Sequence, residues 1–299
     1  MSKERPAYVS TDCNSLDKIM GGKGVPIGVP VGFYGLRNIG KSIISLQLTA
    51  KVASMGYKVI YLDTEAFLED DVFERIMSWF KPRFELTDEQ IKENIEVISV
   101  RDIFQLGRLF GMQYEIVQDQ NKVSCIVKYP RKWSKDNTVT KTTRMSEKWL
   151  EYSPIYKKLE EEEEILVIVL DSITVPYKSK FSPIPQNFPA RAFALESIWD
   201  PILVLSKMFN ISFVVTNHGS KSPMSNYVTP WGGNDMLYFN KRWIGILDGL
   251  KNQRETYGEQ VRRFYRHRWP AFMDDVGVGI LKKDTGYVDL TQDFTKVNL

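Results

Sequence analysis

The sequence has few of the residues that would tie a chain to a structural metal, a disulfide bond or a membrane. Its 299 residues include only two cysteines, Cys13 and Cys125, and only two histidines. Two cysteines without metal-ligand spacing predict free thiols in a reducing cytosol. No run of about 18 apolar residues occurs, which argues against a membrane-spanning helix. The N-terminus is polar, so we expect no signal peptide, no membrane partner and a cytoplasmic location.

A large excess of charge is also lacking. The formal net charge is +3, which is too small to predict nucleic-acid binding, so any basic surface must be local. Hydrophobic residues make up 43% of the chain and charged residues 26%. This balance is typical of a globular protein with a sizeable core.

Strand-like apolar runs alternate with helical spacing along most of the chain. This alternation predicts an α/β fold with a largely parallel twisted sheet that is flanked by helices. Beyond Trp243 the runs become shorter, and we expect antiparallel strands at the C-terminal edge of the sheet. The strands expected are 29–34, 58–62, 95–100, 165–170, 211–216, 243–247, 262–267, 276–281 and 287–290. The helices expected are 42–55, 71–80, 103–112 and 189–208, with a short helix opened by a capping box of Thr87 and Gln90.

The segment from about 114 to 160 interrupts this alternation. The runs 115–117 and 123–128 predict a hairpin. A polar stretch and a helix follow, and the helix ends in the acidic run 160–164, which we interpret as a solvated face. We therefore expect an N-terminal tail over residues 1–9 and one core domain over residues 10–299, with an insertion at about 114–160.

One motif predicts chemistry directly. Residues 35–42 match the phosphate-binding pattern G-x-x-x-x-G-K-[S/T] between a strand-like run and a helical segment. The glycines allow a tight turn whose N–H groups point at an anion, Lys41 adds charge for the β- and γ-phosphates, and Ser42 offers a hydroxyl to Mg²⁺. We therefore expect ATP and Mg²⁺ as cofactors. The expected contacts in this loop are Gly35, Leu36, Arg37, Asn38, Ile39, Gly40, Lys41 and Ser42.

Two acidic residues at the ends of strand-like runs fit the same chemistry. Asp171 ends the aliphatic run 165–170, where P-loop proteins hold Mg²⁺ directly or through water. Glu65 ends the strand after the P-loop helix, where a carboxylate can act as general base on an attacking water. Alone, the first could be a turn aspartate and the second a helix cap or surface charge. Their combination with the P-loop favours the functional interpretation.

These motifs resemble those of the RecA/RadA recombinases, and most closely those of the archaeal RadA paralogues of the RadB and RadC type. The resemblance covers about residues 10–250 and rests on segments 10–17, 21–22, 35–42, 61–65, 170–172, 215–217 and 230–234. It implies a RecA-type P-loop ATPase core with Glu65 as the catalytic base, Lys41 on phosphate, Ser42 on Mg²⁺ and Asp171 as the Walker B acid. It also implies nucleotide contacts from Asn217, His218 and Pro270.

The resemblance further implies two DNA-binding loops, at about 177–188 and 219–233. The second is polar, rich in turn formers and carries Lys221, Tyr227 and Trp231, a mixture of charge and aromatic rings that grips single strands. Its alternative is a surface loop with incidental aromatic residues. A basic stretch of the insertion offers Arg131 and Lys132 as further DNA contacts, unless its charges are simply solvated.

Three departures from the family favour a paralogue over an independent strand-exchange recombinase. His218 stands where the family usually has glutamine, and could contact a phosphate or be structural. The N-terminal helix-hairpin-helix domain and the Phe-x-x-Ala element that links protomers are not recognisable. The first loop lacks the family's arginine and glycines.

We therefore expect an ATP-dependent DNA-binding protein of homologous recombination and DNA repair, acting as a slow DNA-dependent ATPase. We expect it to be a RadA paralogue that binds single-stranded DNA and modulates the recombinase. Its expected partners are single-stranded DNA and either a RadA-type recombinase or further copies of the chain. One alternative is a KaiC-like signalling or scaffold ATPase, against which the segment 232–234 and the aromatic loop argue. The other is a non-hydrolysing recombination mediator, against which Glu65 argues.

Overall fold

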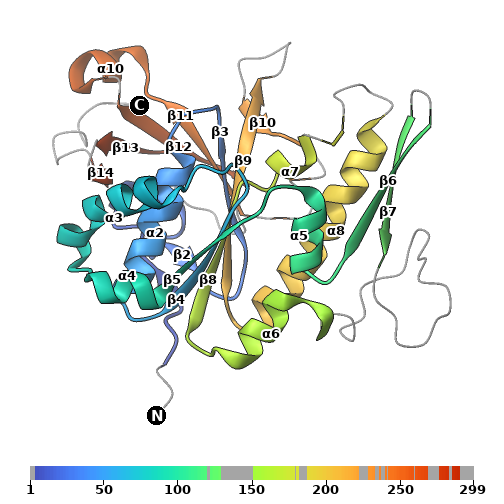
Figure 1. Cartoon of the computed structure of the whole chain (residues 1–299). Helices are drawn as coiled ribbons and strands as arrows, with labels where there is room; N and C mark the ends of the chain where they lie inside the picture. Colours follow the sequence, from blue (N-terminus) through green and yellow to red (C-terminus); the bar gives the residue numbers. More distant parts are fainter. Residues whose placement is uncertain are drawn as a thin grey trace.

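A large mixed sheet forms the centre of the computed structural model (Figure 1). The structure describes residues 4–119, 122–128, 151–178, 180–181, 187–221, 228–232, 236, 240, 242–258, 260–268, 276–282 and 285–289. The main path of the sheet runs β14-β13-β12-β11-β3-β9-β8-β4-β5. The parallel strands are β11 (Trp243–Asp248), β3 (Val31–Gly35), β9 (Ser212–Lys221), β8 (Ile165–Asp171), β4 (Lys58–Asp63) and β5 (Ile95–Ser99).

Antiparallel strands complete the sheet beyond β11. These are β12 (Val261–Arg268), β13 (Val276–Lys282) and β14 (Gly286–Asp289), while β10 (Val228–Pro230) pairs with the end of β9. The predicted α/β class, with a largely parallel sheet and an antiparallel C-terminal edge, is confirmed.

Helices cover both faces of the sheet and enclose two hydrophobic cores (Figure 1). One core includes residues of α1 (Asn14–Ile19), α2 (Lys41–Ser54) and α3 (Asp70–Phe84), with α4 (Asp88–Asn94) beside them. The other includes residues of α5 (Ile103–Leu109), α6 (Pro154–Glu161), α7 (Val175–Lys178) and α8 (Phe188–Met208). Every residue of β8 is buried, because the strand is covered from both sides. A short helix, α10 (Lys251–Tyr257), follows β11. In the described part of the chain, no helix combines the length and apolarity that crossing a membrane requires.

Local differences from the sequence-based prediction have simple physical reasons. The capping box of Thr87 and Gln90 opens α4 as expected. The helix expected to reach residue 112 ends at Leu109, because Gly111 adopts a φ of +76° and turns the chain into the next strand. The loop expected over 219–233 is partly regular, since Gly219, Ser220 and Lys221 pair with the β10 residues. Val228 is buried in this hairpin, as suits a β-branched residue.

The predicted hairpin of the insertion is present as β6 (Gln113–Asp119) and β7 (Lys122–Lys128). It packs against α8. The Val123 N–H donates to Oδ1 of buried Asn187 at 3.1 Å, and the Tyr114 hydroxyl lies 2.8 Å from the Ser197 hydroxyl. The insertion therefore begins as part of the core.

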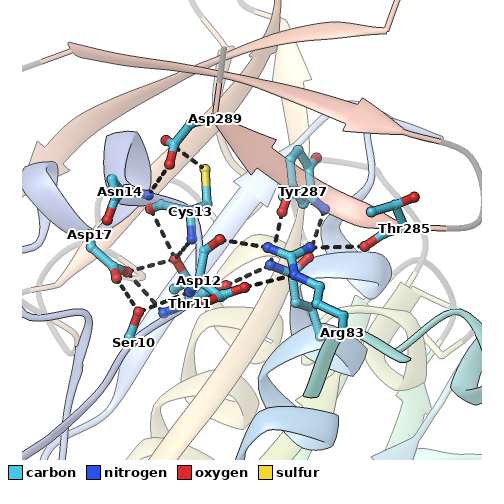
Figure 2. Close-up of polar contacts among 11 residues, drawn as sticks. Ser10, Thr11, Asp12, Cys13, Asn14, Asp17, Arg83, Thr285, Tyr287 and Asp289 are labelled. Carbon is cyan, nitrogen blue, oxygen red and sulfur yellow. Dashed lines mark hydrogen bonds and ion pairs between the residues drawn. The ribbon is translucent and has the colours of Figure 1, made fainter. Parts of the chain in front are cut away.

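Polar contacts join the N-terminal segment to the C-terminal edge of the sheet (Figure 2). Within the expected tail, β1 (Tyr8–Val9) pairs with β2 (Val25–Pro26). Asp289 accepts hydrogen bonds from the backbone N–H groups of Asn14 at 2.8 Å and Ser15 at 2.7 Å. Arg83 contacts the Asp12 carboxylate at 2.7 Å and the Thr285 carbonyl at 2.9 Å. These contacts hold β14 against α1.

Candidate nucleotide-binding site

The predicted site residues meet at the carboxyl ends of four neighbouring parallel strands. The P-loop follows β3, Glu65 follows β4, Asp171 ends β8, and His218 lies in β9. The register aligns them, since Gly35 faces His218 across one strand pair and Asp63 faces Asp171 across another. In open α/β sheets the crevice at these strand ends is the usual position of a ligand.

The P-loop requires glycine at both ends. Gly40 precedes α2 with a φ of +103°, and a Cβ there would lie 2.4 Å from the Tyr287 hydroxyl oxygen. A Cβ on Gly35 would lie 2.4 Å from the Ile246 carbonyl oxygen. Neither position has room for a side chain, because residues of neighbouring strands pack closely against the loop.

Lys41 is buried with its ammonium group inside the loop. Its side chain donates to the Leu36 carbonyl at 2.8 Å, and the residue is 6% exposed. Burial lowers the pKa of Lys41, while the negative charges of Asp171 and Glu65 oppose that shift. A buried cation that is held by a carbonyl is well placed to bind a phosphate anion.

Asp171 is held by hydroxyl groups from the neighbouring strands. Tyr61 donates to Oδ2 at 2.7 Å, and Thr216 donates to Oδ1. Burial raises the pKa of Asp171, and the hydroxyls of Thr216, Tyr61 and Ser42 oppose that shift. Carboxylate and hydroxyl oxygens suit Mg²⁺, which commonly takes its other ligands from phosphate and water. Over the described residues, no group of three or more His, Cys, Asp or Glu side chains gathers as an all-protein metal site.

Glu65 is hydrogen bonded to the histidine that departs from the family pattern. The His218 Nε2–H donates to Glu65 Oε1 at 2.8 Å, and the two side chains are 17% and 31% exposed. This bond is the main cause that lowers the pKa of Glu65. Thr64 fixes the strand end, because its hydroxyl donates to the Ser172 carbonyl and accepts from the Ser172 N–H, both at 2.7 Å. Glu65 is therefore ionised near neutral pH and oriented.

The end of β9 connects this site to the β9–β10 hairpin. The Trp231 N–H donates to the His218 carbonyl at 2.7 Å, and the Asn217 side-chain amide donates to the Trp231 carbonyl at 3.0 Å. Buried Asn217 Oδ1 and Thr174 Oγ1 have no hydrogen-bond partner within the described structure. Buried polar atoms without partners are costly, and a bound ligand or its waters could satisfy them.

The residues predicted to bind DNA are only partly within the described structure. Lys221 is exposed at the end of β9, while Trp231 is half-buried and packs against the core. Arg131, Lys132, Tyr227 and the nucleotide contact Pro270 lie outside the described residues. The motifs missed Tyr61 and Thr216, which orient Asp171, because a contact between strands has no local sequence signal.

Comparison with known proteins agrees with the resemblance drawn from the motifs. No model of a known protein family matches the chain. It is similar to the DNA repair and recombination protein RadB of Methanococcoides burtonii, at 23% identity over 258 residues, which cover 86% of this chain and 88% of the relative. RadB of Methanosphaera stadtmanae is 25% identical over 246 residues, which cover 81% of this chain and 82% of the relative. This similarity supports a relation between the chain and the RecA/RadA superfamily.

Proposed function

We propose that this chain is an ATP-dependent DNA-binding protein of DNA repair and recombination, in which hydrolysis of Mg-ATP controls the β9–β10 hairpin. One observation carries the proposal: Lys41, Asp171 and Glu65 converge at the carboxyl ends of the parallel strands, and Glu65 contacts the hairpin through His218. The names of the two RadB relatives support the biological role.

Binding begins at the P-loop. The backbone N–H groups of residues 35–42 and the Lys41 ammonium would hold the β- and γ-phosphates, with Lys41 exchanging the Leu36 carbonyl for phosphate oxygen. Mg²⁺ held by Ser42 and Asp171 would neutralise phosphate charge. Tyr61 and Thr216 keep the Asp171 carboxylate in place for this role.

Glu65 would act as the general base. Its lowered pKa keeps it ionised near neutral pH, and His218 occupies only one carboxylate oxygen, Oε1. The other oxygen can accept a proton from water. Catalysis would come mainly from positioning and electrostatics, and we expect slow hydrolysis.

The hairpin would respond through the two residues at the end of β9. His218 contacts Glu65 by its side chain and Trp231 by its carbonyl, while Asn217 holds the Trp231 carbonyl. A change at the γ-phosphate that displaces His218 would therefore move the base of the hairpin. This link gives single-stranded DNA binding a dependence on the nucleotide. A RadA-type recombinase or further copies of the chain remain the proposed protein partners.

The proposal is tested first at the nucleotide. Lys41→Ala removes the charge aimed at the phosphates and should weaken Mg-ATP binding about 100-fold or more. Isothermal titration measures the affinity, and thermal melting checks the fold. Lys51→Ala is the matched control, since Lys51 lies in the same helix with its ammonium 5.2 Å from the Phe84 ring. Equal affinity in the two folded variants would contradict the site.

A KaiC-like ATPase and a non-hydrolysing mediator predict different results. The first predicts no salt-dependent affinity for an oligonucleotide, and the second predicts no turnover that depends on Glu65. Both quantities are measurable on the intact chain.

A further inference from the structure

Two cations lie over the ring of Trp231. The Lys178 ammonium is 5.3 Å and the Arg191 guanidinium 4.3 Å from the ring centroid, and Arg191 is also 4.4 Å from the Phe188 ring. Trp231 follows β10, Lys178 ends α7, and Arg191 lies in the first turn of α8, so three elements meet here (Figure 1). Cation–π contacts of this kind hold the cations in a defined position.

The same place concentrates positive charge. Burial lowers the pKa of Lys178, the charge of Glu65 opposes that shift, and Lys41, Arg37 and Arg191 lower the pKa further. No described carboxylate forms an ion pair with Lys178. Neighbouring positive charge disfavours the charged form of Lys178, and an approaching anion would favour it, which points to a polyanionic ligand.

We propose that Lys178 and Arg191 bind phosphate groups of a single-stranded nucleic acid, and that Trp231 orders these cations instead of stacking on a base. The inference rests on the proposed function and names the groups that would carry its DNA binding. Arg191 already covers a face of the Trp231 ring. Because Asn217 and His218 hold the backbone of Trp231, the phosphate grip would also depend on the nucleotide.

The γ-phosphate of a nucleotide is the other phosphate group that these cations could bind, because the charges of Lys41 and Glu65 affect the pKa of Lys178. The test therefore has two arms. Fluorescence anisotropy of a labelled oligothymidylate measures nucleic-acid affinity at several salt concentrations. Titration with a fluorescent ATP analogue measures nucleotide affinity.

The variants are Lys178→Gln, Arg191→Gln and the double change. Lys180→Gln is the matched control, since the Lys180 ammonium lies 5.4 Å from the Phe104 ring, in the same kind of contact away from Trp231. Each single variant should bind the oligonucleotide about fivefold more weakly at about 0.1 M salt, and the double variant should lower the salt slope by about 1.4. Affinity for the ATP analogue should stay at the parent value.

A second measurement separates ordering of cations from stacking on bases. Trp231→Ala should weaken binding of the oligothymidylate and of an abasic oligomer of equal charge by the same factor. Trp231→Phe should restore most of the affinity, because phenylalanine keeps an aromatic face. A loss confined to the oligothymidylate would show stacking and overturn the role of Trp231.

The remaining outcomes are distinct. If the parent binds the oligonucleotide and the variants match Lys180→Gln, the inference is wrong and the proposed function stands. If only affinity for the ATP analogue falls, the cations belong to the nucleotide site and the inference is wrong. If the parent binds no oligonucleotide at all, the inference and the DNA-binding part of the proposed function both fail.

Discussion

At the scale of single residues, the proposed chemistry depends most directly on Glu65. Glu65→Gln replaces the carboxylate by an amide of nearly the same shape, which can still accept the His218 hydrogen bond but cannot take a proton. ATP affinity should stay near the parent value, while turnover should fall about 100-fold or more. Phosphate release measures turnover, and titration measures affinity. Glu69→Gln, on an exposed residue of the following loop, should change neither. Parent-level turnover in Glu65→Gln would show that another group positions the water.

For single residues, the motifs predicted the charged side chains of the site. They did not predict the residues that hydrogen bond to those side chains and orient them. The P-loop pattern, Asp171 and Glu65 could be read from the sequence because each lies at a strand end beside an apolar run. Tyr61 and Thr216 donate hydrogen bonds to Asp171 from neighbouring strands. A local sequence pattern does not predict the order of strands in a sheet, so these contacts could not be predicted. His218 and Glu65 are in contact although they are 153 positions apart in the sequence. The sequence therefore showed that histidine replaces the usual glutamine, but it did not show that His218 contacts Glu65.

Among the elements, the C-terminal strands β12 and β14 contact the P-loop directly. The Tyr287 hydroxyl donates to the Ile39 carbonyl at 2.8 Å, and Arg262 Nε donates to the same carbonyl at 3.2 Å. Tyr287 is fully buried, and its ring lies 5.3 Å from the Phe264 ring. Antiparallel strands at the edge of the sheet therefore define the shape of the loop.

Tyr287→Phe should keep the ring packing and remove the hydroxyl donor. Stability should fall by about 1 kcal/mol, and ATP affinity should fall several-fold because the Ile39 carbonyl is less restrained. The matched control is Tyr57→Phe, which removes a hydroxyl that donates to the Glu4 carbonyl at 2.7 Å. Chemical denaturation and nucleotide titration compare the two variants. If both lose the same stability and neither loses ATP affinity, the strands do not shape the loop.

Long buried strands follow the sequence pattern more closely than short strands and helix ends do. Long strands such as β8 were predicted nearly to the residue, because continuous burial leaves a continuous aliphatic run. The end of α5 and the strand β10 were missed. At Gly111 the apolar stripe continues while the backbone turns, and Val228 sits in a short stretch whose pairing partner decides its conformation.

For the whole molecule, the sheet brings the proposed catalytic residues and the proposed DNA-binding residues to one end. Glu65 contacts His218, His218 and Asn217 hold Trp231, and Trp231 lies against Lys178 and Arg191. A chain of direct contacts thus leads from the proposed base to the proposed phosphate-binding cations. The α/β class followed from the alternation of patterns, but this chain of contacts depends on the strand order β3-β9-β8-β4.

The most direct test of the central claim is the affinity of a labelled oligothymidylate in a slowly hydrolysed Mg-ATP analogue compared with Mg-ADP. The parent should differ between the two states by about fivefold or more, as coupled sites typically do. His218→Ala should bring the ratio close to one while it still binds the nucleotide. Equal oligonucleotide affinity of the parent in both states would contradict the account.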